Sequence, residues 1–215
     1  MGTEILLNFP YLRKKMVTFE DLDLTDRYEL VKSLPKTFRR GVEIGVWQGQ
    51  FTGHMIAHTN MHVTGIDPWC ETASHADVDY DAEDYNPFAF GEDGYLSQEA
   101  RYVGSINILS QFNPTRWTLL RSFSHRVLPY VSPEVDFVYI DGLHSYESVK
   151  EDIHDWFPKL KSGGILCGHD YNATNPGTIQ AVDEFAEESG LELKITGTSP
   201  EKGDADAPSW LFIKK

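Results

Sequence analysis

The sequence predicts an α/β fold, a doubly wound sheet that is mostly parallel and ends in an antiparallel C-terminal closing strand. Short apolar runs alternate with helical patterns along the chain, which is typical of parallel strands joined by crossover helices. No internal repeat and no linker rich in Gly and Ser divides the 215 residues. A chain of this length can bury a core of its own, so we expect one domain over residues 1–215.

Two helices and two strands are expected in the N-terminal third of the chain. Thr25 is a candidate N-cap for a helix over residues 26–34, and Pro35 ends this helix. The helix belongs to an N-terminal helical segment, residues 1–39, that precedes the sheet. The elements that follow are a buried strand, a helix and a second buried strand at residues 41–45, 50–58 and 63–66.

The rest of the chain predicts further strands and helices in alternation. Residues 149–160 carry apolar side chains on one helical face, and Gly163-Gly164 stops this helix. A second helix is expected over residues 178–188. Strands are expected at residues 117–120, 136–140, 165–167, 191–196 and 210–213, the last two as an antiparallel pair.

The alternation of strands and helices breaks after the second strand. Residues 70–97 are rich in Asp, Glu, Tyr and Gly, and an insertion of this length in a compact domain is usually a functional loop. Asp77, Asp79 and Asp81 alternate as calcium ligands do, but Ala82 stands where a calcium loop needs glycine. We therefore predict a substrate lid rather than a calcium site.

The composition excludes several classes of partner. Asp and Glu total 33 against 19 Lys and Arg, a formal net charge of −14, which works against nucleic acid and anionic membranes as partners. No apolar run approaches the ~20 residues that span a bilayer. The two cysteines, Cys70 and Cys167, build neither a disulfide framework nor a cysteine zinc site, so we expect a reducing, cytoplasmic location.

The most informative segment lies where the first strand turns into the following helix. A dinucleotide fingerprint needs glycine at its third position, and Trp47 stands there between Gly45 and Gly49. An indole would obstruct a phosphate, so the loop suits a nucleoside ligand without phosphates. Asp67 ends the second strand, where a carboxylate can accept hydrogen bonds from ribose hydroxyls. The alternative is that the glycines serve tight turns and Asp67 only caps the strand end.

Motifs along most of the chain resemble the class I S-adenosylmethionine-dependent methyltransferases, which have a Rossmann-like fold. Two segments match the cofactor motifs of that superfamily: Glu-x-Gly-x-x-x-Gly at residues 43–49 and Gly-Ile-Asp-Pro at residues 65–68. Four further segments are similar to a subfamily of small-molecule and sugar O-methyltransferases, of the macrocin O-methyltransferase type. These segments are residues 136–146, 163–164, 168–171 and 181–185. The resemblance covers residues 40 to 190, without the insertion.

The resemblance implies S-adenosyl-L-methionine as cofactor. The glycines would pass beside its methionine moiety, and the acid at the end of the second strand would hold its ribose. Trp47 and Trp69 flank this place and offer stacking faces, although packing explains them equally well. The expected cofactor-binding residues are Glu43, Gly45, Trp47, Gly49, Asp67, Pro68, Trp69, Ser122 and Asp141.

Ionisable residues follow the fourth and fifth strands. Asp141 ends the fourth strand, and His169-Asp170 ends the fifth, so these groups share one rim of the sheet. His144 follows in the loop after Asp141 and is the expected base that removes the proton of an acceptor hydroxyl. The expected catalytic residues are His144, Asp141 and His169. Each has a structural alternative: a helix cap, an exposed loop histidine and a brace of the strand end.

A divalent cation is a further expectation from the resemblance. Related sugar methyltransferases hold a metal on three acids, and the corresponding positions here are Asp141, His169 and Asp170. His169 replaces one carboxylate, so magnesium is less well matched than manganese, and catalysis without any metal is an alternative.

The resulting functional hypothesis is an O-methyltransferase that acts on a hydroxyl of a sugar, glycan or related polar metabolite. The aromatic and acidic insertion suits such an acceptor, and the acidic rim favours neutral molecules. One alternative is a nicotinamide-dependent oxidoreductase, against which Trp47 argues. A second is a non-catalytic nucleoside-binding module. The sequence leaves a homodimer open and does not identify the acceptor.

Overall fold

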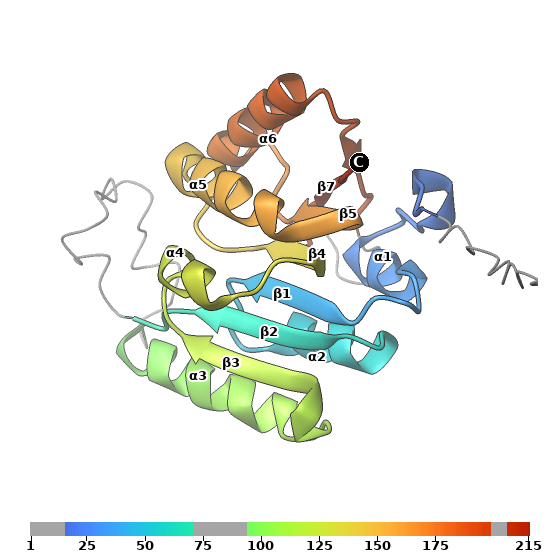
Figure 1. Ribbon diagram of the computed structural model, residues 1–215. Helices are drawn as coiled ribbons and strands as arrows, with labels where there is room; N and C mark the ends of the chain where they lie inside the picture. The colour runs from blue at the N-terminus through green and yellow to red at the C-terminus, as the bar shows by residue number, and fades with distance from the viewer. Residues whose placement is uncertain (1–15, 71–93, 199–205) are drawn as a thin grey trace, which may run out of the picture.

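The computed structural model describes residues 16–70, 94–198 and 206–215, which form one seven-stranded sheet with helices on both faces (Figure 1). The strand order is β3-β2-β1-β4-β5-β7-β6. Strands β1 to β5 are parallel, and β7 runs antiparallel to both β5 and β6. The predicted doubly wound sheet with its antiparallel closing pair is therefore confirmed.

The strands lie close to where the apolar runs predicted them. All six residues of β4 are buried, as expected for a central strand with helices on both faces. The bounds are β1 (Arg40–Ile44), β2 (His62–Asp67), β3 (Trp117–Arg121), β4 (Val135–Ile140), β5 (Leu160–Gly168), β6 (Lys194–Ile195) and β7 (Trp210–Ile213).

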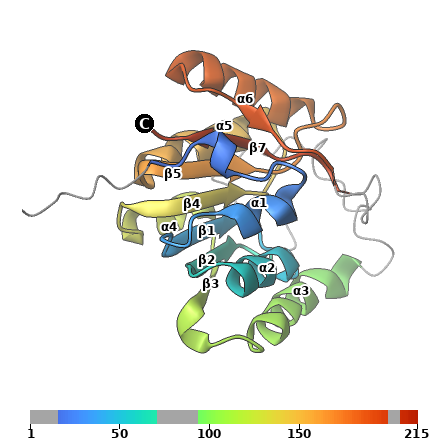
Figure 2. The same ribbon diagram turned by 90° about the vertical axis from the view of Figure 1, so that its right-hand side faces the viewer.

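Two sets of helices cover the sheet, one on each face (Figures 1 and 2). The first set packs on the core around Phe137 and Tyr139 and consists of α1 (Arg27–Ser33), α2 (Gln50–His58) and α3 (Gly94–Leu109). The second set packs on the core around Val138 and Ile140 and consists of α4 (Ser124–Val127), α5 (Tyr146–Trp156) and α6 (Pro176–Ser189). Short 3-10 turns lie at Phe19–Asp21, Pro114–Arg116, Leu128–Tyr130 and Phe157–Lys159.

The first helix begins one residue later than predicted, because its N-cap is Asp26 and not Thr25. The Asp26 Oδ1 accepts hydrogen bonds from the backbone N–H groups of Tyr28 and Glu29, both at 2.8 Å. A carboxylate satisfies two of the unpaired N–H groups of the first turn and complements the helix dipole.

Two further elements, α5 and β5, begin clearly earlier than the sequence predicted. Helix α5 begins at Tyr146, after Ser145 as its cap, and so starts earlier than the apolar pattern indicated. Strand β5 begins at Leu160, and Gly163 and Gly164 lie inside it rather than before it. The backbone of these glycines pairs with Lys214, through N···O distances of 2.7 and 2.9 Å, which extends the ladder beyond the apolar run.

The largest element that the apolar pattern missed is α3. Its first four residues, 94–97, belong to the segment predicted as a lid. The remainder of that segment, residues 71–93, lies outside the described residues, as do residues 1–15. Among the described helices, none combines the length and the apolar character needed to cross a bilayer.

The capping contact makes a prediction about stability. Asp26→Ala removes the acceptor for two backbone N–H groups and is expected to cost about 1 kcal/mol, or a melting temperature lower by roughly 2–4 °C. Thr25→Ala is the matched control, since Thr25 is exposed and does not cap the helix. Thermal unfolding of both variants by circular dichroism checks this. An equal loss in the two variants would contradict the assignment of the cap.

Candidate functional site

A cavity of about 1110 Å³ opens at the carboxyl ends of the central strands. It lies where β1 is flanked by β2 on one side and β4 on the other, the switch point at which open α/β sheets bind ligands. Every expected cofactor residue lines this cavity except Gly49, which instead caps α2 at a φ of 83°. Of the ionisable rim residues, Asp141, His144 and His169 also line it.

The loop after β1 requires glycine at Gly45 for two reasons. Its φ is +84°, in the left-handed region that side chains disfavour. A Cβ at this position would also lie 1.9 Å from the carbonyl oxygen of Asp141. The backbone of β1 therefore passes directly beside the end of β4, which brings the loop after β1 and the rim residues together.

Asp67 anchors the same loop. Its Oδ2 accepts hydrogen bonds from the backbone N–H groups of Val46 and Trp47, both at 3.0 Å, and its Oδ1 accepts one from Trp69 at 2.8 Å. Burial raises the pKa of Asp67, and these three bonds oppose the rise. Since each carboxylate oxygen has two lone-pair sites, Oδ1 keeps one for a ligand hydroxyl.

The two tryptophans have different surroundings. Trp69 is only 1% exposed, and its Nε1 donates to the carbonyl oxygen of Trp47 at 2.8 Å. It supports the loop from within the core. Trp47 is 46% exposed at a φ of 57°, and the guanidinium carbon of Arg101 lies 3.4 Å from the centre of its ring. Trp47 therefore offers a ring at the cavity, whereas Trp69 mainly fixes the backbone around it.

Glu43 is buried beneath the loop with 1% of its surface exposed. The hydroxyl of Thr52 donates to its Oε2. Burial raises the pKa of Glu43 well above its usual range, because the charged form of the carboxyl is disfavoured away from water.

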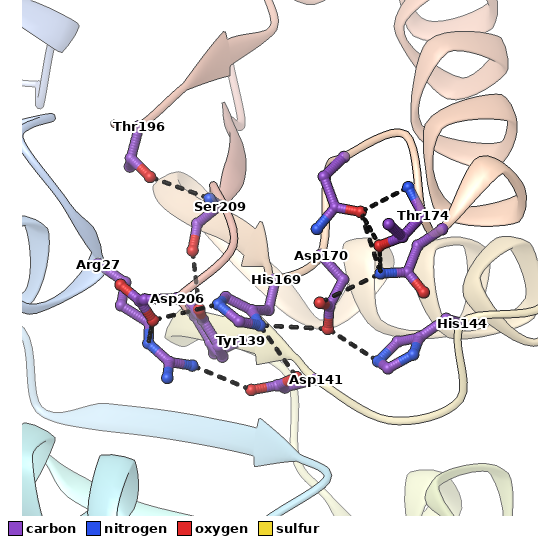
Figure 3. Close-up of polar contacts among 12 residues, drawn as sticks. Arg27, Tyr139, Asp141, His144, His169, Asp170, Thr174, Thr196, Asp206 and Ser209 are labelled. Carbon is purple, nitrogen blue, oxygen red and sulfur yellow. Dashed lines mark hydrogen bonds and ion pairs between the residues drawn. The ribbon is translucent and has the colours of Figure 1, made fainter. Parts of the chain in front are cut away.

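Four charged groups close a ring beside the cavity, which we call the charge ring: Arg27, Asp141, His169 and Asp206 (Figure 3). Arg27 lies 3.3 Å from Asp141 through Nη1 and 2.9 Å from Asp206 through Nε. His169 lies 3.6 Å from Asp141 through Nδ1 and 3.5 Å from Asp206 through Nε2. Positive and negative groups alternate, and the ring joins α1, the ends of β4 and β5, and the segment before β7.

His169 occupies a cationic place in this ring. Burial alone would lower the pKa of His169, but hydrogen bonds to Asp141, Asp170 and Asp206 raise it to about 11. An imidazolium carries a proton on both nitrogens and neither binds a metal nor accepts a proton. The geometry therefore favours a structural and electrostatic role for His169 over the catalytic and metal-binding roles that the sequence suggested.

His144 and Asp170 form the second polar group of the rim. The His144 Nε2 lies 2.8 Å from Asp170 Oδ2, and 44% of the histidine side chain is exposed. Burial lowers the pKa of His144, whereas the hydrogen bond and charge of Asp170, with the charge of Asp141, raise it overall. Burial also disfavours the Asp170 carboxylate, but hydrogen bonds from His144 and His169 bring its pKa well below the usual range.

A group of three ligand atoms in the described residues has the spacing of a metal site. One atom each from Asp141, His144 and Asp170 lies within 4.8 Å of the others. The trio differs from the predicted set by one residue, because His144 takes the place of His169.

Sequence reasoning missed Arg27 and Asp206. They lie 179 positions apart (206 − 27) and outside the motifs that carry the resemblance, and a lone Arg or Asp in a polar segment gives no pattern to recognise. Only the folded arrangement brings them to the end of β4.

A family model described as a methyltransferase domain matches residues 42–171, more than half of the chain. The chain belongs to this family. The expectation of a methyltransferase is therefore confirmed, and the oxidoreductase alternative has no support.

A curated relative matches only in part. An uncharacterized protein of Sinorhizobium fredii, y4gI, is 30% identical over 59 residues, which are 27% of this chain and 6% of that protein. This chain thus corresponds to a small fraction of that relative's length.

Solved structures share the fold at low identity. The O-methyltransferase TomG from Streptomyces achromogenes, solved in complex with SAM, is 11% identical with a TM-score of 0.59, over 87% of this chain and 78% of TomG. A putative O-methyltransferase from Klebsiella pneumoniae is 14% identical with a TM-score of 0.54, over 84% and 75% of the two chains. An rRNA methylase from Streptococcus thermophilus is 15% identical with a TM-score of 0.56, over 87% and 93%. The shared fold alone does not indicate which class of acceptor this chain methylates.

The contact between Gly45 and Asp141 predicts a steric requirement that can be separated from backbone strain. Gly45→Ala places a Cβ against the Asp141 carbonyl, whereas Gly163→Ala adds one at a similar φ, +75°, with nothing within 4 Å. We expect Gly45→Ala to lower the free energy of unfolding by roughly 1–3 kcal/mol more than Gly163→Ala. Urea unfolding of both variants measures the difference. Equal losses would show that strain alone requires glycine at position 45.

Proposed function

We propose that this methyltransferase uses S-adenosyl-L-methionine to methylate a hydroxyl group of a sugar, glycan or related polar metabolite. The observation that carries the proposal is the His144–Asp170 pair, 2.8 Å apart, on the rim of a cavity at the switch point of a methyltransferase domain. This pair supplies the proton acceptor that a hydroxyl nucleophile needs.

The cavity supports a phosphate-free donor. Trp47 stands where a dinucleotide loop has glycine, and Asp67 Oδ1 keeps acceptor capacity for a ribose hydroxyl. TomG, a neighbour in fold, holds SAM in its solved complex. Gly45 brings this donor loop against the end of β4, which supports a position near His144 for the methyl group of a bound donor.

The chemistry follows from the acceptor. A sulfonium methyl is already reactive, but a hydroxyl is a poor nucleophile while it keeps its proton. His144 removes that proton during attack, and Asp170 orients the imidazole and stabilises the imidazolium that forms. Such a base contributes typically ~10²–10⁴ in rate. Alignment of oxygen, methyl carbon and sulfur in one line supplies the remaining advantage.

Metal-assisted catalysis is a second possible mechanism, and the spacing of three ligand atoms favours it. Asp141, His144 and Asp170 offer two carboxylates and an imidazole within 4.8 Å, a donor set that suits manganese better than magnesium. A bound divalent ion would lower the pKa of the acceptor hydroxyl. In this mode His144 is a ligand, so the metal and the base role of His144 are alternatives.

The charges at the cavity support an acceptor that is neutral or cationic. Glu147 and Glu151 line the cavity on α5 and are exposed, and the whole chain carries a formal charge of −14. A nucleic acid or a phosphorylated sugar would meet unfavourable potential there. Hydroxyl-rich neutral molecules instead find many hydrogen-bond acceptors.

Binding and product analysis test the proposal. We expect S-adenosylhomocysteine to bind in calorimetry and to raise the melting temperature, whereas NAD does neither. Incubation with S-adenosylmethionine and a panel of glycans and polar metabolites is expected to yield a product heavier by the mass of one CH₂ group. Absence of binding at millimolar ligand would refute the donor assignment, and binding without any product would favour a non-catalytic module.

Chelation separates the two modes of catalysis. With His144 as the base and no metal, we expect full activity in EDTA, and His144→Ala is expected to lose ~10²–10⁴ of the rate while it still binds S-adenosylhomocysteine. With a metal, activity disappears in EDTA and returns with manganese. Unchanged turnover of His144→Ala would exclude both roles. His154→Ala is the control, because His154 lies on α5 against Glu188, away from the cavity.

A further inference from the structure

Three histidines recur at intervals of four residues from α2 into β2, and the proposed chemistry uses none of them: His54, His58 and His62. None of the three lines the cavity. Both ring nitrogens of His62 are occupied, Nδ1 on the carbonyl oxygen of Thr115 at 2.9 Å and Nε2 on the hydroxyl of Thr118 at 3.0 Å. The structure therefore reduces the row to a pair one turn apart on α2, His54 and His58.

The ring of His54 is held in one orientation. Its Nε2 lies 3.0 Å from the carbonyl oxygen of Tyr28, which can only accept a hydrogen bond. In the neutral ring Nε2 therefore carries the proton and Nδ1 carries the lone pair. The rings of Tyr28 and Phe51 pack around the imidazole, with ring centres 5.0 and 6.3 Å from its own. A hydrogen bond on the second nitrogen is the usual device that orients a histidine ligand toward a metal.

The surroundings of His54 favour its neutral form. Burial lowers the pKa of His54, and the charges of His58 and Lys32 act in the same direction. The backbone hydrogen bond and the charge of Glu29 oppose this shift only in part. The nearby lysines are held by other groups, Lys32 by Glu29 at 2.5 Å and Lys36 by the carbonyl oxygen of His58 at 3.0 Å. A neutral imidazole keeps the lone pair that a metal ion needs.

The spacing of the His54 and His58 rings matches a right angle at a shared metal ion. Their centres lie 4.3 Å apart, and their planes are inclined by 40°. A metal–nitrogen distance of about 2.0–2.1 Å puts the ion ~3.2 Å from each ring centre, so the centres would lie ~4.5 Å apart at a right angle and ~5.2 Å apart at a tetrahedral angle. Nickel(II) and copper(II) favour right angles between nitrogen ligands, whereas zinc(II) favours the tetrahedral arrangement.

We propose that His54 and His58 form a second metal site, separate from the cavity, that binds a divalent transition ion of the nickel and copper class. Two histidines four residues apart lie on one face of a helix and can share a metal ion. His54 supplies Nδ1 from a fixed ring, the exposed His58 supplies the second nitrogen, and water completes the coordination. The site does not depend on the proposed function.

A bound ion would act on the contact between two helices. Helices α1 and α2 pack against each other on the same face of the sheet (Figure 2). The carbonyl group that orients His54 belongs to Tyr28 of α1, and both Tyr28 and Arg27 line the cavity. The ion therefore stabilises the position of α1 from outside the cavity. Because only the folded helix brings the two histidines together, metal binding also stabilises the fold.

A nickel titration tests the proposal. The titration uses untagged protein that carries His144→Ala in every sample, because this change removes the imidazole of the trio at the rim. We expect this parent protein to bind nickel in calorimetry. His58→Gln is expected to weaken the binding at least about tenfold, since the second ligand is no longer held beside the first. His58 is exposed, so this variant should keep the fold, and circular dichroism checks that it does.

His154→Gln is the matched control. It removes an exposed histidine from another helix, α5, and should keep the nickel affinity of the parent. As a second readout, nickel is expected to raise the melting temperature of the parent but not that of His58→Gln. Magnesium prefers oxygen ligands and should affect both proteins equally. The proposal fails if the parent does not bind nickel, if His58→Gln binds it as tightly as the parent, or if His154→Gln weakens binding to the same extent.

Discussion

The charge ring of Arg27, Asp141, His169 and Asp206 is the interaction on which the rest of the site depends. A buried charge without a partner is costly, and removal of one partner from a buried pair typically costs about 3–5 kcal/mol. Here each of the four groups faces two opposite charges, with separations of 2.9 to 3.6 Å. The ring therefore fixes the end of β4 from both sides, and Asp141 has little freedom to turn.

Around Asp141 the site contains further carboxyl groups, which differ in their burial and in their hydrogen-bond partners. Asp170 stays ionised because two histidines donate to it, and it orients His144 toward the cavity. Burial beneath the loop raises the pKa of Glu43 well above its usual range. Asp67 uses three of its four acceptor sites on backbone N–H groups. The pKa of the same functional group thus shifts in different directions at these three positions, according to burial and to the local partners.

The sequence predicted the sheet well because parallel central strands are buried on both faces and read as continuous apolar runs, as in β4. It predicted the turn between β1 and α2 because Gly45 and Asp67 are tied to backbone geometry. The sequence did not predict features that depend on tertiary contacts or that lack a strong apolar pattern. The N-cap of α1 is Asp26 rather than Thr25, β5 is extended by its pairing with Lys214, and α3 has no strong apolar stripe. The partners of His169 come from distant segments, so its cationic state left no trace in the local sequence.

The position of Asp206 in the sequence also determines when the charge ring can close during synthesis. Asp206 precedes β7, and β7 pairs between β5 and β6, so both are translated after every other part of the site. Until Asp206 and β7 have left the ribosome, Arg27 and His169 have Asp141 but not Asp206 as an acidic partner in the ring. The edge of β5 that pairs with β7 is also unpaired at that stage. A nascent chain that holds all five parallel strands therefore still lacks Asp206, one of the two acidic members of the charge ring beside the cavity.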